Sequence, residues 1–380
     1  MNFLKLDRYL ESLLSQGLPM YDCTIHVDYR EVYRRQGGYI DVAAGVRHRP
    51  DTRYFMYSAT KPVTCTAALT LLEAGKFRMG DPLFWYLPEF EHMQVADRKP
   101  GGCPTLRPAE RPIRIRDLFQ MTAGMTYNIH MPALREAIRA TGGRAPTREI
   151  ARAMAREPLS FDPGDRWQYG FCHDVLAALV EVIAGERFAD YVNRVIFSPL
   201  GMVHSSFHAG ADTSDMAGQY RFNDVTKKAN EIDLTNPFIF GEEYDSGGGG
   251  MVSTAEDYIR FADMLAHGGV GEGGVRILSA PTAALLSHGG LSPAQAASFN
   301  WEGMEGRNYG FGVSIHRDPG LSGSTSPVGE FGWGGAAGSA VYVDPASRTA
   351  VFYAQHVMNA HEERVMAALR NVVFACLGAD

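Results

Sequence analysis

The sequence predicts an α/β protein, with strands and helices at both ends of the chain and a mostly helical segment between them. Three observations predict this class. Short strand-like runs precede a long helical pattern near the N-terminus, Pro and Gly clusters divide the middle into short helices, and a hairpin pattern followed by a helix closes the chain. Strands beside long helices are typical of an antiparallel sheet packed on helices. With 380 residues, 45% of them hydrophobic, the chain can bury a sizeable core.

The N-terminal part is predicted as a helix, three strands and a second helix. Leucines among charged residues indicate an amphipathic surface helix that ends at Gly17. Three strand-like runs follow, at residues 21–29, 31–35 and 39–46. The second helix starts at Ser58 and ends at Gly75, a residue that commonly stops helices. Pro62 fits this helix because it falls in the first turn, where its missing N–H would be unpaired anyway.

The C-terminal part is predicted to begin after a glycine run at residues 247–250. A helix over residues 254–266 follows, with Ser253 or Thr254 as its N-cap and acidic residues in its first turn. The chain then ends in a hairpin and a closing helix, predicted at residues 337–343, 349–357 and 360–376.

The composition argues against two classes of binding partner. The net charge is -7, and no basic run is longer than the pair Lys227 and Lys228, which argues against nucleic acid and against an anionic membrane surface. No stretch of 18 uncharged apolar residues and no signal-peptide pattern is visible, so we expect a soluble cytoplasmic protein. Five scattered cysteines without a C-x-x-C pair are expected to be free thiols.

The stretch MYSATKPVT contains a candidate nucleophile and its base. Serine needs a base within hydrogen-bond reach, and a helix places Ser58 and Lys61 on one face. The N–H of a serine that opens a helix is also free to face a developing oxyanion. The chain has six lysines against thirty arginines, and arginine could not act as the base. The spacing alone leaves an alternative, in which Ser58 caps the helix and Lys61 is solvated.

Several further stretches occur in a family-specific order: IRIRDLFQMTAGMTY, PGDRWQYGFCHDV, FSPLGMVHSSF, GGGGMVSTAEDY and FGWGGAAGSAVYVDP. With the Ser58 stretch, they make nearly the whole chain resemble the family of class C β-lactamases, low-molecular-weight penicillin-binding proteins, D-aminopeptidases and family VIII esterases. The resemblance implies a β-lactamase/transpeptidase-like fold. Residues 1–78 and 246–380 would form one α/β lobe, with an antiparallel sheet flanked by helices, and residues 79–245 a mostly helical inserted lobe.

The second family element is Tyr-x-Asn, here Tyr169-Gly170-Phe171. The resemblance implies that Tyr169 and Lys61 together pass a proton from Ser58 to the leaving group. Taken alone, Tyr169 would instead be interpreted as an amphipathic ring packed under the turn at Pro163-Gly164. Phe171 stands where many β-lactamases carry Asn, and this departure removes an amide that could bind a peptide-like substrate group.

The third family element is Lys-Thr-Gly in most β-lactamases and is Trp333-Gly334-Gly335 here. The glycines allow close approach to backbone N–H groups, and the resemblance implies that the N–H of Ala336 completes an oxyanion hole with that of Ser58. Trp333 replaces the cation that pairs with the carboxylate of β-lactams, and W-G-G is similar to family VIII esterases. A packing role would be the alternative for Trp333.

We therefore expect a serine hydrolase that works through an acyl-enzyme, a carboxylesterase on small esters without metal or cofactor. The substrate-binding residues would be Phe171, Trp333, Gly334 and Gly335. A β-lactamase, a D-stereospecific peptidase or amidase, and a non-catalytic penicillin-binding-like protein remain alternatives. The chain contains no G-x-S-x-G nucleophile elbow and no H-E-x-x-H metal motif. The oligomeric state and the roles of His173 and Asp174 are left open.

Overall fold

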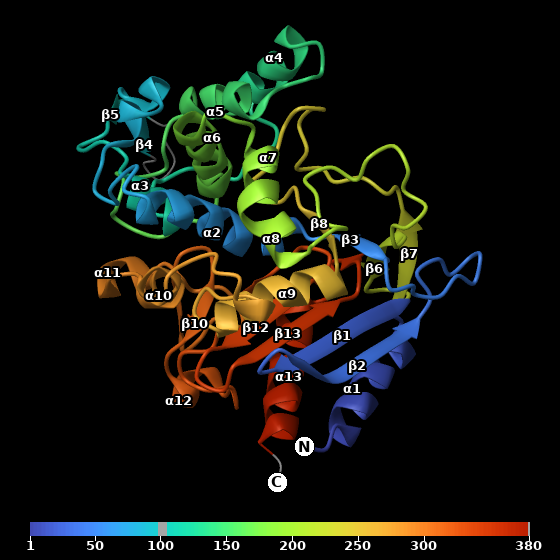
Figure 1. The fold of residues 1–380 in the computed structure, drawn as a ribbon. Helices are drawn as coiled ribbons and strands as arrows, with labels where there is room; N and C mark the ends of the chain where they lie inside the picture. The colour runs from blue at the N-terminus through green and yellow to red at the C-terminus, as the bar shows by residue number, and fades with distance from the viewer. Residues whose placement is uncertain (98–104, 379–380) are drawn as a thin grey trace.

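A computed structural model describes residues 1–97 and 105–378, and its centre is a seven-stranded antiparallel sheet (Figure 1). The strand order is β2-β1-β13-β12-β11-β10-β9, so strands from both ends of the chain share one sheet. Every neighbouring pair in it is antiparallel. This confirms the predicted α/β class. The strands are β1 Met20–Val27, β2 Arg30–Gly38, β9 Arg307–Tyr309, β10 Ser314–His316, β11 Phe331–Gly334, β12 Ala340–Asp344 and β13 Thr349–Ala354.

Helices cover both faces of the sheet (Figure 1). Below it in this view lie α1 (Leu4–Ser15) and α13 (Glu362–Leu377), which pack together, and the Tyr9 hydroxyl donates to the carbonyl of Val365 at 3.0 Å. Above it lies α9 (Ala255–Ala266), which packs on β1, β12 and β13. The Thr254 side chain accepts a hydrogen bond from the N–H of Asp257 and caps α9, which is one of the two predicted caps.

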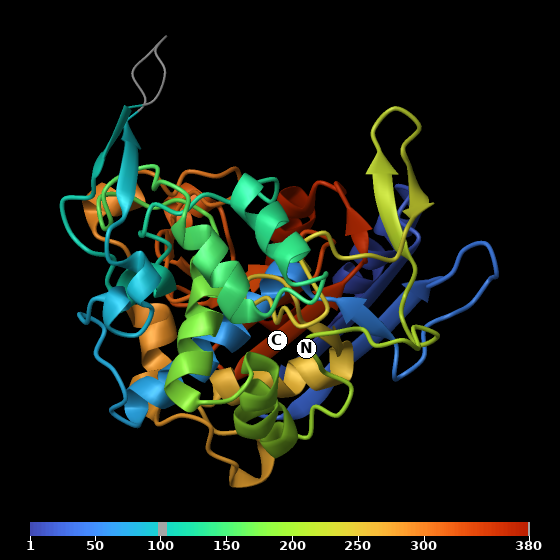
Figure 2. The same cartoon turned by 90° about the horizontal axis from the view of Figure 1, so that it is seen from above.

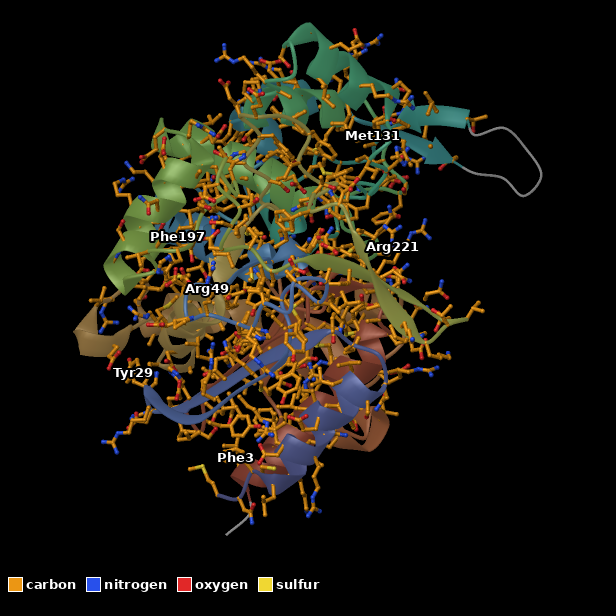
Figure 3. All side chains as sticks on the ribbon, turned by 90° about the vertical axis from the view of Figure 1, so that its right-hand side faces the viewer. Phe3, Tyr29, Arg49, Met131, Phe197 and Arg221 are labelled. Carbon is orange, nitrogen blue, oxygen red and sulfur yellow. The ribbon has the colours of Figure 1, made fainter. Side chains whose placement is uncertain are left out.

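Helix α2 (Thr60–Glu73) is buried on nearly all sides, as expected for a helix in the interior. It packs against α6 (Cys172–Ala184) of the middle segment and against α10 (Ala280–His288). The middle segment is mostly helical and lies over the sheet-bearing part, as Figures 2 and 3 show from above and from the side. Its other helices are α3 Ile115–Phe119, α4 Pro132–Ala140, α5 Thr147–Ala155, α7 Phe188–Val192 and α8 Ser198–Leu200.

The remaining elements are short. Two small helices lie in the C-terminal part, α11 Pro293–Ala296 and α12 Pro319–Ser322. The small sheets pair β3 Arg53–Phe55 with β8 Val252–Thr254, β4 Gln94–Asp97 with β5 Thr105–Pro108, and β6 Gln219–Asn223 with both β7 Lys228–Ile232 and β14 Val357–Met358. The pairing of β14 with β6 joins the middle segment to the C-terminal part. The division of the chain into lobes at residues 78 and 246 stays a prediction.

Two predicted strands differ in the structure. Residues 39–46 form a closed turn, because the N–H of Ile40 donates to the carbonyl of Val46 and the N–H of Val46 donates to that of Asp41. These backbone groups bond to each other, so they do not extend the sheet. The predicted strand 349–357 ends at Ala354, because His356 adopts a φ of 50°, a left-handed conformation that breaks an extended run.

Four cysteines of the described chain are buried free thiols, which agrees with the expectation for them: Cys23, Cys65, Cys172 and Cys376. The fifth, Cys103, lies outside the described residues. Across residues 1–97 and 105–378, no helix has the length and apolar character needed to cross a membrane.

Candidate active site

Ser58 lies in a short 3-10 turn, Tyr57–Ala59, that leads into α2, and it precedes the start of the regular helix at Thr60 by two residues. Tyr57 has a φ of 47°, a left-handed conformation that costs an ordinary residue roughly 1–2 kcal/mol. Burial of its ring and a 2.6 Å hydrogen bond from its hydroxyl to Oε1 of Gln219 hold this conformation. The turn leaves the Ser58 side chain partly exposed at the end of a buried helix.

Lys61 is fully buried beside Ser58. Its Nζ donates to Oγ of Ser58 at 3.0 Å and to the carbonyl oxygen of Gly248 at 2.5 Å. It also lies 4.6 Å from the ring centroid of Tyr169. The alternative that Lys61 is a solvated first-turn residue is therefore wrong, because its ammonium group is enclosed and points at the serine.

Tyr169 and Trp333 complete a row of polar atoms that ends at Ser58. The Tyr169 hydroxyl donates to Oγ of Ser58 at 2.6 Å, and the indole Nε1 of Trp333 lies 3.4 Å from the same hydroxyl oxygen. The two rings are stacked with centroids 5.9 Å apart. The indole N–H of Trp333 is a hydrogen-bond donor in the site that the sequence did not predict. A negative charge that develops on the Tyr169 oxygen would lie beside this donor and the Lys61 ammonium group.

The backbone after β11 approaches the turn that carries Ser58. Within the described chain, the N–H groups of Ser58 and Ala336 donate no hydrogen bond, so both are available to an oxyanion. The Ser339 hydroxyl donates to the carbonyl of Met56 at 2.9 Å and holds the two segments together. At Gly335 the backbone passes so close to Met56 that a side chain would not fit.

A cavity of about 500 Å³ opens onto these groups. Its wall includes Ser58, Tyr169, Trp333 and the backbone of residues 334–336, together with Trp301. The predicted substrate-binding residues Trp333, Gly334 and Gly335 thus line the same cavity as the nucleophile. Phe171 does not, because its ring is buried and packs against other aromatic rings behind the site.

Tyr127 is a site residue that sequence analysis did not single out, although it ends one of the family stretches. Its ring centroid lies 5.5 Å from Nζ of Lys61 and 5.3 Å from the ring of Tyr169. Burial raises the pKa of Tyr127 well above its usual value, with the nearby Tyr169 adding to the effect and the Ser58 side chain opposing it. A neutral Tyr127 therefore forms one wall around the Lys61 ammonium group and keeps water from it.

His173 lies behind the site rather than in the cavity. Its Nε2 is 3.5 Å from Sγ of Cys65 and 3.3 Å from the carbonyl oxygen of Phe119. Burial, together with the charge of Lys61, lowers the pKa of His173 to about 3. His173 is therefore a neutral packing residue beneath α2 near neutral pH.

Asp174 anchors the glycine run that holds Lys61. Its Oδ1 accepts hydrogen bonds from the Tyr244 hydroxyl at 2.6 Å, the Ser246 hydroxyl at 2.6 Å and the N–H of Gly248 at 3.1 Å. The carbonyl of the same Gly248 accepts from Lys61. A side chain at Gly248 would collide with the Asp174 carboxylate, whose Oδ2 would lie 2.3 Å from the added Cβ. The glycine run is thus an acceptor for the lysine, a role that its composition did not suggest.

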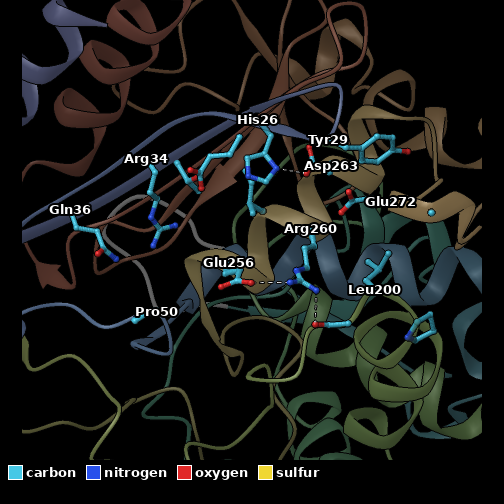
Figure 4. Close-up of a pocket in the computed structure, with 16 residues that line it drawn as sticks. His26, Tyr29, Arg34, Gln36, Pro50, Leu200, Glu256, Arg260, Asp263 and Glu272 are labelled. Carbon is cyan, nitrogen blue, oxygen red and sulfur yellow. Dashed lines mark hydrogen bonds and ion pairs between the residues drawn. The ribbon is translucent and has the colours of Figure 1, made fainter.

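A larger hollow of about 870 Å³ lies elsewhere, between the β1–β2 hairpin and α9 (Figure 4). Polar and charged side chains line it, among them His26, which contacts Asp263 at 2.6 Å, and Arg260, which pairs with Glu256 at 2.9 Å. It does not reach Ser58, Lys61 or Tyr169. The smaller cavity is therefore the candidate active site, because it alone of the two joins a nucleophile to free backbone N–H donors.

Comparison with known proteins agrees with the fold. The family model described as Beta-lactamase matches residues 7–374. Protein Rv1367c of Mycobacterium tuberculosis (strain H37Rv) is 32% identical over 328 residues, which cover 83% of this chain and 80% of that protein. Esterase EstB of Burkholderia gladioli is 28% identical, with 83% of this chain and 80% of the esterase covered.

Solved structures share the fold. EstCE1, a hydrolase with promiscuous acyltransferase activity, superposes with a TM-score of 0.78 at 24% identity and covers 97% of each chain. The simvastatin synthase LovD of Aspergillus terreus superposes with a TM-score of 0.82 at 21% identity, covering 99% of this chain and 98% of the other. The family-model match over residues 7–374 and the 32% identity to Protein Rv1367c show that the chain belongs to the β-lactamase family.

Proposed function

We propose that this protein is a carboxylesterase that hydrolyses small esters through a covalent acyl-enzyme on Ser58. One observation carries the proposal. Oγ of Ser58 lies within hydrogen-bond distance of both Nζ of Lys61, at 3.0 Å, and the hydroxyl of Tyr169, at 2.6 Å. A serine becomes a nucleophile when a positioned base takes its proton, and this pair provides one.

The reaction would proceed in two steps. The Lys61 and Tyr169 pair takes the proton of Ser58 as Oγ attacks the ester carbonyl, and the N–H groups of Ser58 and Ala336 stabilise the oxyanion. The carbon–oxygen bond to the alcohol then breaks, and Tyr169 returns the proton to the leaving oxygen. Water, deprotonated by the same pair, attacks the acyl-enzyme and releases the acid and Ser58. The nucleophile, the base and the oxyanion donors of this scheme all belong to the chain.

Trp333 favours esters over β-lactams as substrates. A β-lactam carries a carboxylate, which pairs well with a cation such as lysine or arginine. Trp333 offers instead a ring and one N–H, and that N–H already points at the Tyr169 oxygen. The similarity to Esterase EstB supports the same choice. Trp333, which stands in place of the lysine of the third family element, thus favours substrates that have a neutral group beside the scissile bond.

A β-lactamase or amidase would use the same centre and is the second candidate. The D-amino acid amidase of Ochrobactrum anthropi shares the fold, with a TM-score of 0.72 at 17% identity. Rates on p-nitrophenyl butyrate, nitrocefin and a D-phenylalanine anilide, measured side by side, distinguish the candidates. We expect the ester to be cleaved fastest and Ser58→Ala to abolish the reaction. Faster cleavage of nitrocefin would contradict the ester assignment, and full turnover by Ser58→Ala would contradict the nucleophile.

A further inference from the structure

A buried cluster of charges adjoins the cavity that holds Ser58. It consists of Arg307, Glu330 and Arg370, two guanidinium groups and one carboxylate. Both Nη nitrogens of Arg307 donate to Oε2 of Glu330 at 3.0 Å, and Nε of Arg370 lies 3.2 Å from the same oxygen. Glu330 is fully buried, and the Arg370 side chain is 11% exposed. The cluster therefore carries an uncompensated positive charge in a place with little water.

The two arginines differ in how their donors are used. Arg307 is occupied by Glu330 and by Ser314, whose hydroxyl accepts from Nε at 2.9 Å. Arg370 packs over the ring of Tyr342, with its guanidinium carbon 4.4 Å from the centroid. Across the described part of the chain, nothing accepts a hydrogen bond from its terminal Nη nitrogens. Arg370 also lines the cavity, whereas Arg307 does not.

The pKa of Arg307 reflects the same excess of positive charge. Burial lowers the pKa of Arg307 to about 10, and the charge of Arg370 is the next cause. A buried cation that lacks a full partner is costly, and an anion brought by a ligand would offset that cost. Two carboxylates also line the cavity, Glu302 and Glu362. Glu302 is about two-thirds exposed and lies 3.5 Å from Arg364, so solvent and that partner screen its charge. Oε1 of Glu362 accepts a hydrogen bond from the N–H of Ala360 at 3.4 Å.

A path of small and apolar residues connects this charge with Ser58. Gly334, Gly332 and Ala340 line the cavity along β11 and β12, and Gly332 pairs in register with Tyr342, on whose ring Arg370 lies. Two residues of strand, from Gly334 to Gly332, span roughly 7 Å. A ligand group that extends from the nucleophile along these strands would reach the guanidinium group after a short apolar spacer.

We propose that Arg370 binds a carboxylate of the substrate, separated from the scissile ester by an apolar spacer. The substrates would then be monoesters of dicarboxylic acids, or esters of alcohols that carry a carboxylate. The proposal rests on the proposed esterase function and adds a substrate class to it. The proposed anion site differs in position from the family element that contains Trp333. Arg370 belongs to α13 and contacts Glu330, which directly precedes the first residue of β11.

The test compares charged and neutral esters of equal length. One pair places the charge on the acyl side, p-nitrophenyl hydrogen adipate against its methyl ester. A second places it on the alcohol side, 4-butyryloxybenzoate against its methyl ester. For the side that points at Arg370, we expect the ratio of kcat/KM, charged over neutral, to fall at least about tenfold in Arg370→Gln. Arg370→Lys should keep part of the preference for the charged ester. Arg348→Gln, which changes an exposed arginine in the β12–β13 turn, should keep all of this preference.

A binding measurement separates this proposal from the esterase assignment. Calorimetric titration of Ser58→Ala with monomethyl adipate reports the anion site without turnover, and adding Arg370→Gln should weaken binding at least about tenfold. If Arg370→Gln changes neither ratio by more than about twofold and leaves this binding unchanged, the anion site is refuted while the esterase stands. If no ester is turned over but the binding depends on Arg370, the esterase assignment fails and the anion site stands.

Discussion

A Cβ atom on Gly335 would lie 2.2 Å from the carbonyl oxygen of Met56, a distance too short for any real side chain. Met56 directly precedes the turn with Tyr57 and Ser58, and Gly335 directly precedes Ala336. The close approach of these two backbones places Ser58 and Ala336, the residues proposed to donate to the oxyanion, on neighbouring segments. In the proposed mechanism, this glycine would thus support the oxyanion hole without touching the substrate's oxygen.

Replacing Gly335 by alanine should separate these backbones. We expect Gly335→Ala to lower kcat for p-nitrophenyl butyrate by about tenfold to a thousandfold, the range seen when an oxyanion donor is lost. Gly80→Ala is the matched control, since a Cβ there would have nothing within 4 Å. Esterase assays and thermal unfolding of both variants check this. An active Gly335→Ala with wild-type kcat would show that the close approach is unimportant.

Lys61 should be needed as a base and not merely as a positive charge. Lys61→Arg keeps a cation and hydrogen-bond donors, but a guanidinium group does not lose its proton in proteins. We expect both Lys61→Arg and Lys61→Met to lower kcat by about a hundredfold to ten-thousandfold. Lys76→Met, at an exposed lysine just after the end of α2, should leave kcat unchanged. High activity in Lys61→Arg would indicate a purely electrostatic role.

Asp174 should support both the fold and the lysine. Asp174→Ala leaves three buried donors without their acceptor, and each such loss costs about 1–3 kcal/mol. We expect the free energy of unfolding to fall by about 3 kcal/mol or more, and kcat to fall with little change in KM because Gly248 no longer fixes Lys61. Urea denaturation and steady-state kinetics measure the two effects. Asp190→Ala, at an exposed aspartate, is the control, and an equal loss there would refute the assignment.

Buried histidines should make the protein less stable in mild acid. The folded-state pKa is about 3 for His173 and about 4 for His356, both below the ordinary 6.5, chiefly because of burial. The unfolded chain therefore binds more protons below pH 6.5. Stability is complete above that pH and falls on acidification, by roughly 1.4 kcal/mol per histidine and pH unit until each folded-state pKa is reached.

Urea denaturation between pH 7.5 and 5 checks this dependence. His173→Gln should reduce the slope of unfolding free energy against pH, since one of the contributing groups is gone. His92→Gln, at a histidine whose side chain is 90% exposed, should leave the slope as in the wild type. A wild-type protein equally stable at both pH values would contradict the prediction.

Local patterns predicted much of the fold because they act over a few residues. The leucines of α1, the Thr254 cap of α9 and the closing hairpin each carry their own signal. The closed turn at residues 39–46 was missed because alternating apolar residues also occur in exposed loops, and hydrogen bonds between its own ends override the strand pattern. No local sequence pattern indicates the left-handed backbone conformation of His356, which ends the extended run of β13.

The site was predictable where a motif or family order marked it. Ser58 and Lys61 lie one helical turn apart, and Tyr169 and Trp333 fell in recognisable stretches. The contributions of Asp174 and Arg370 were not predictable, because they depend on contacts between distant segments: a carboxylate under a glycine run, and a guanidinium group that α13 brings to the end of β11. Phe171 was wrongly predicted to line the cavity, because it lies two residues after Tyr169, which does line it. The ring of Phe171 packs against Tyr127, behind the site.

Covalent labelling tests the central claim most directly. A fluorophosphonate reacts with an activated serine, forming a phosphorus–oxygen bond as fluoride leaves. We predict one label per chain by intact mass, located on the peptide that contains Ser58 and absent from Ser58→Ala. A label on another serine, or undiminished labelling and ester turnover in Ser58→Ala, would contradict the account.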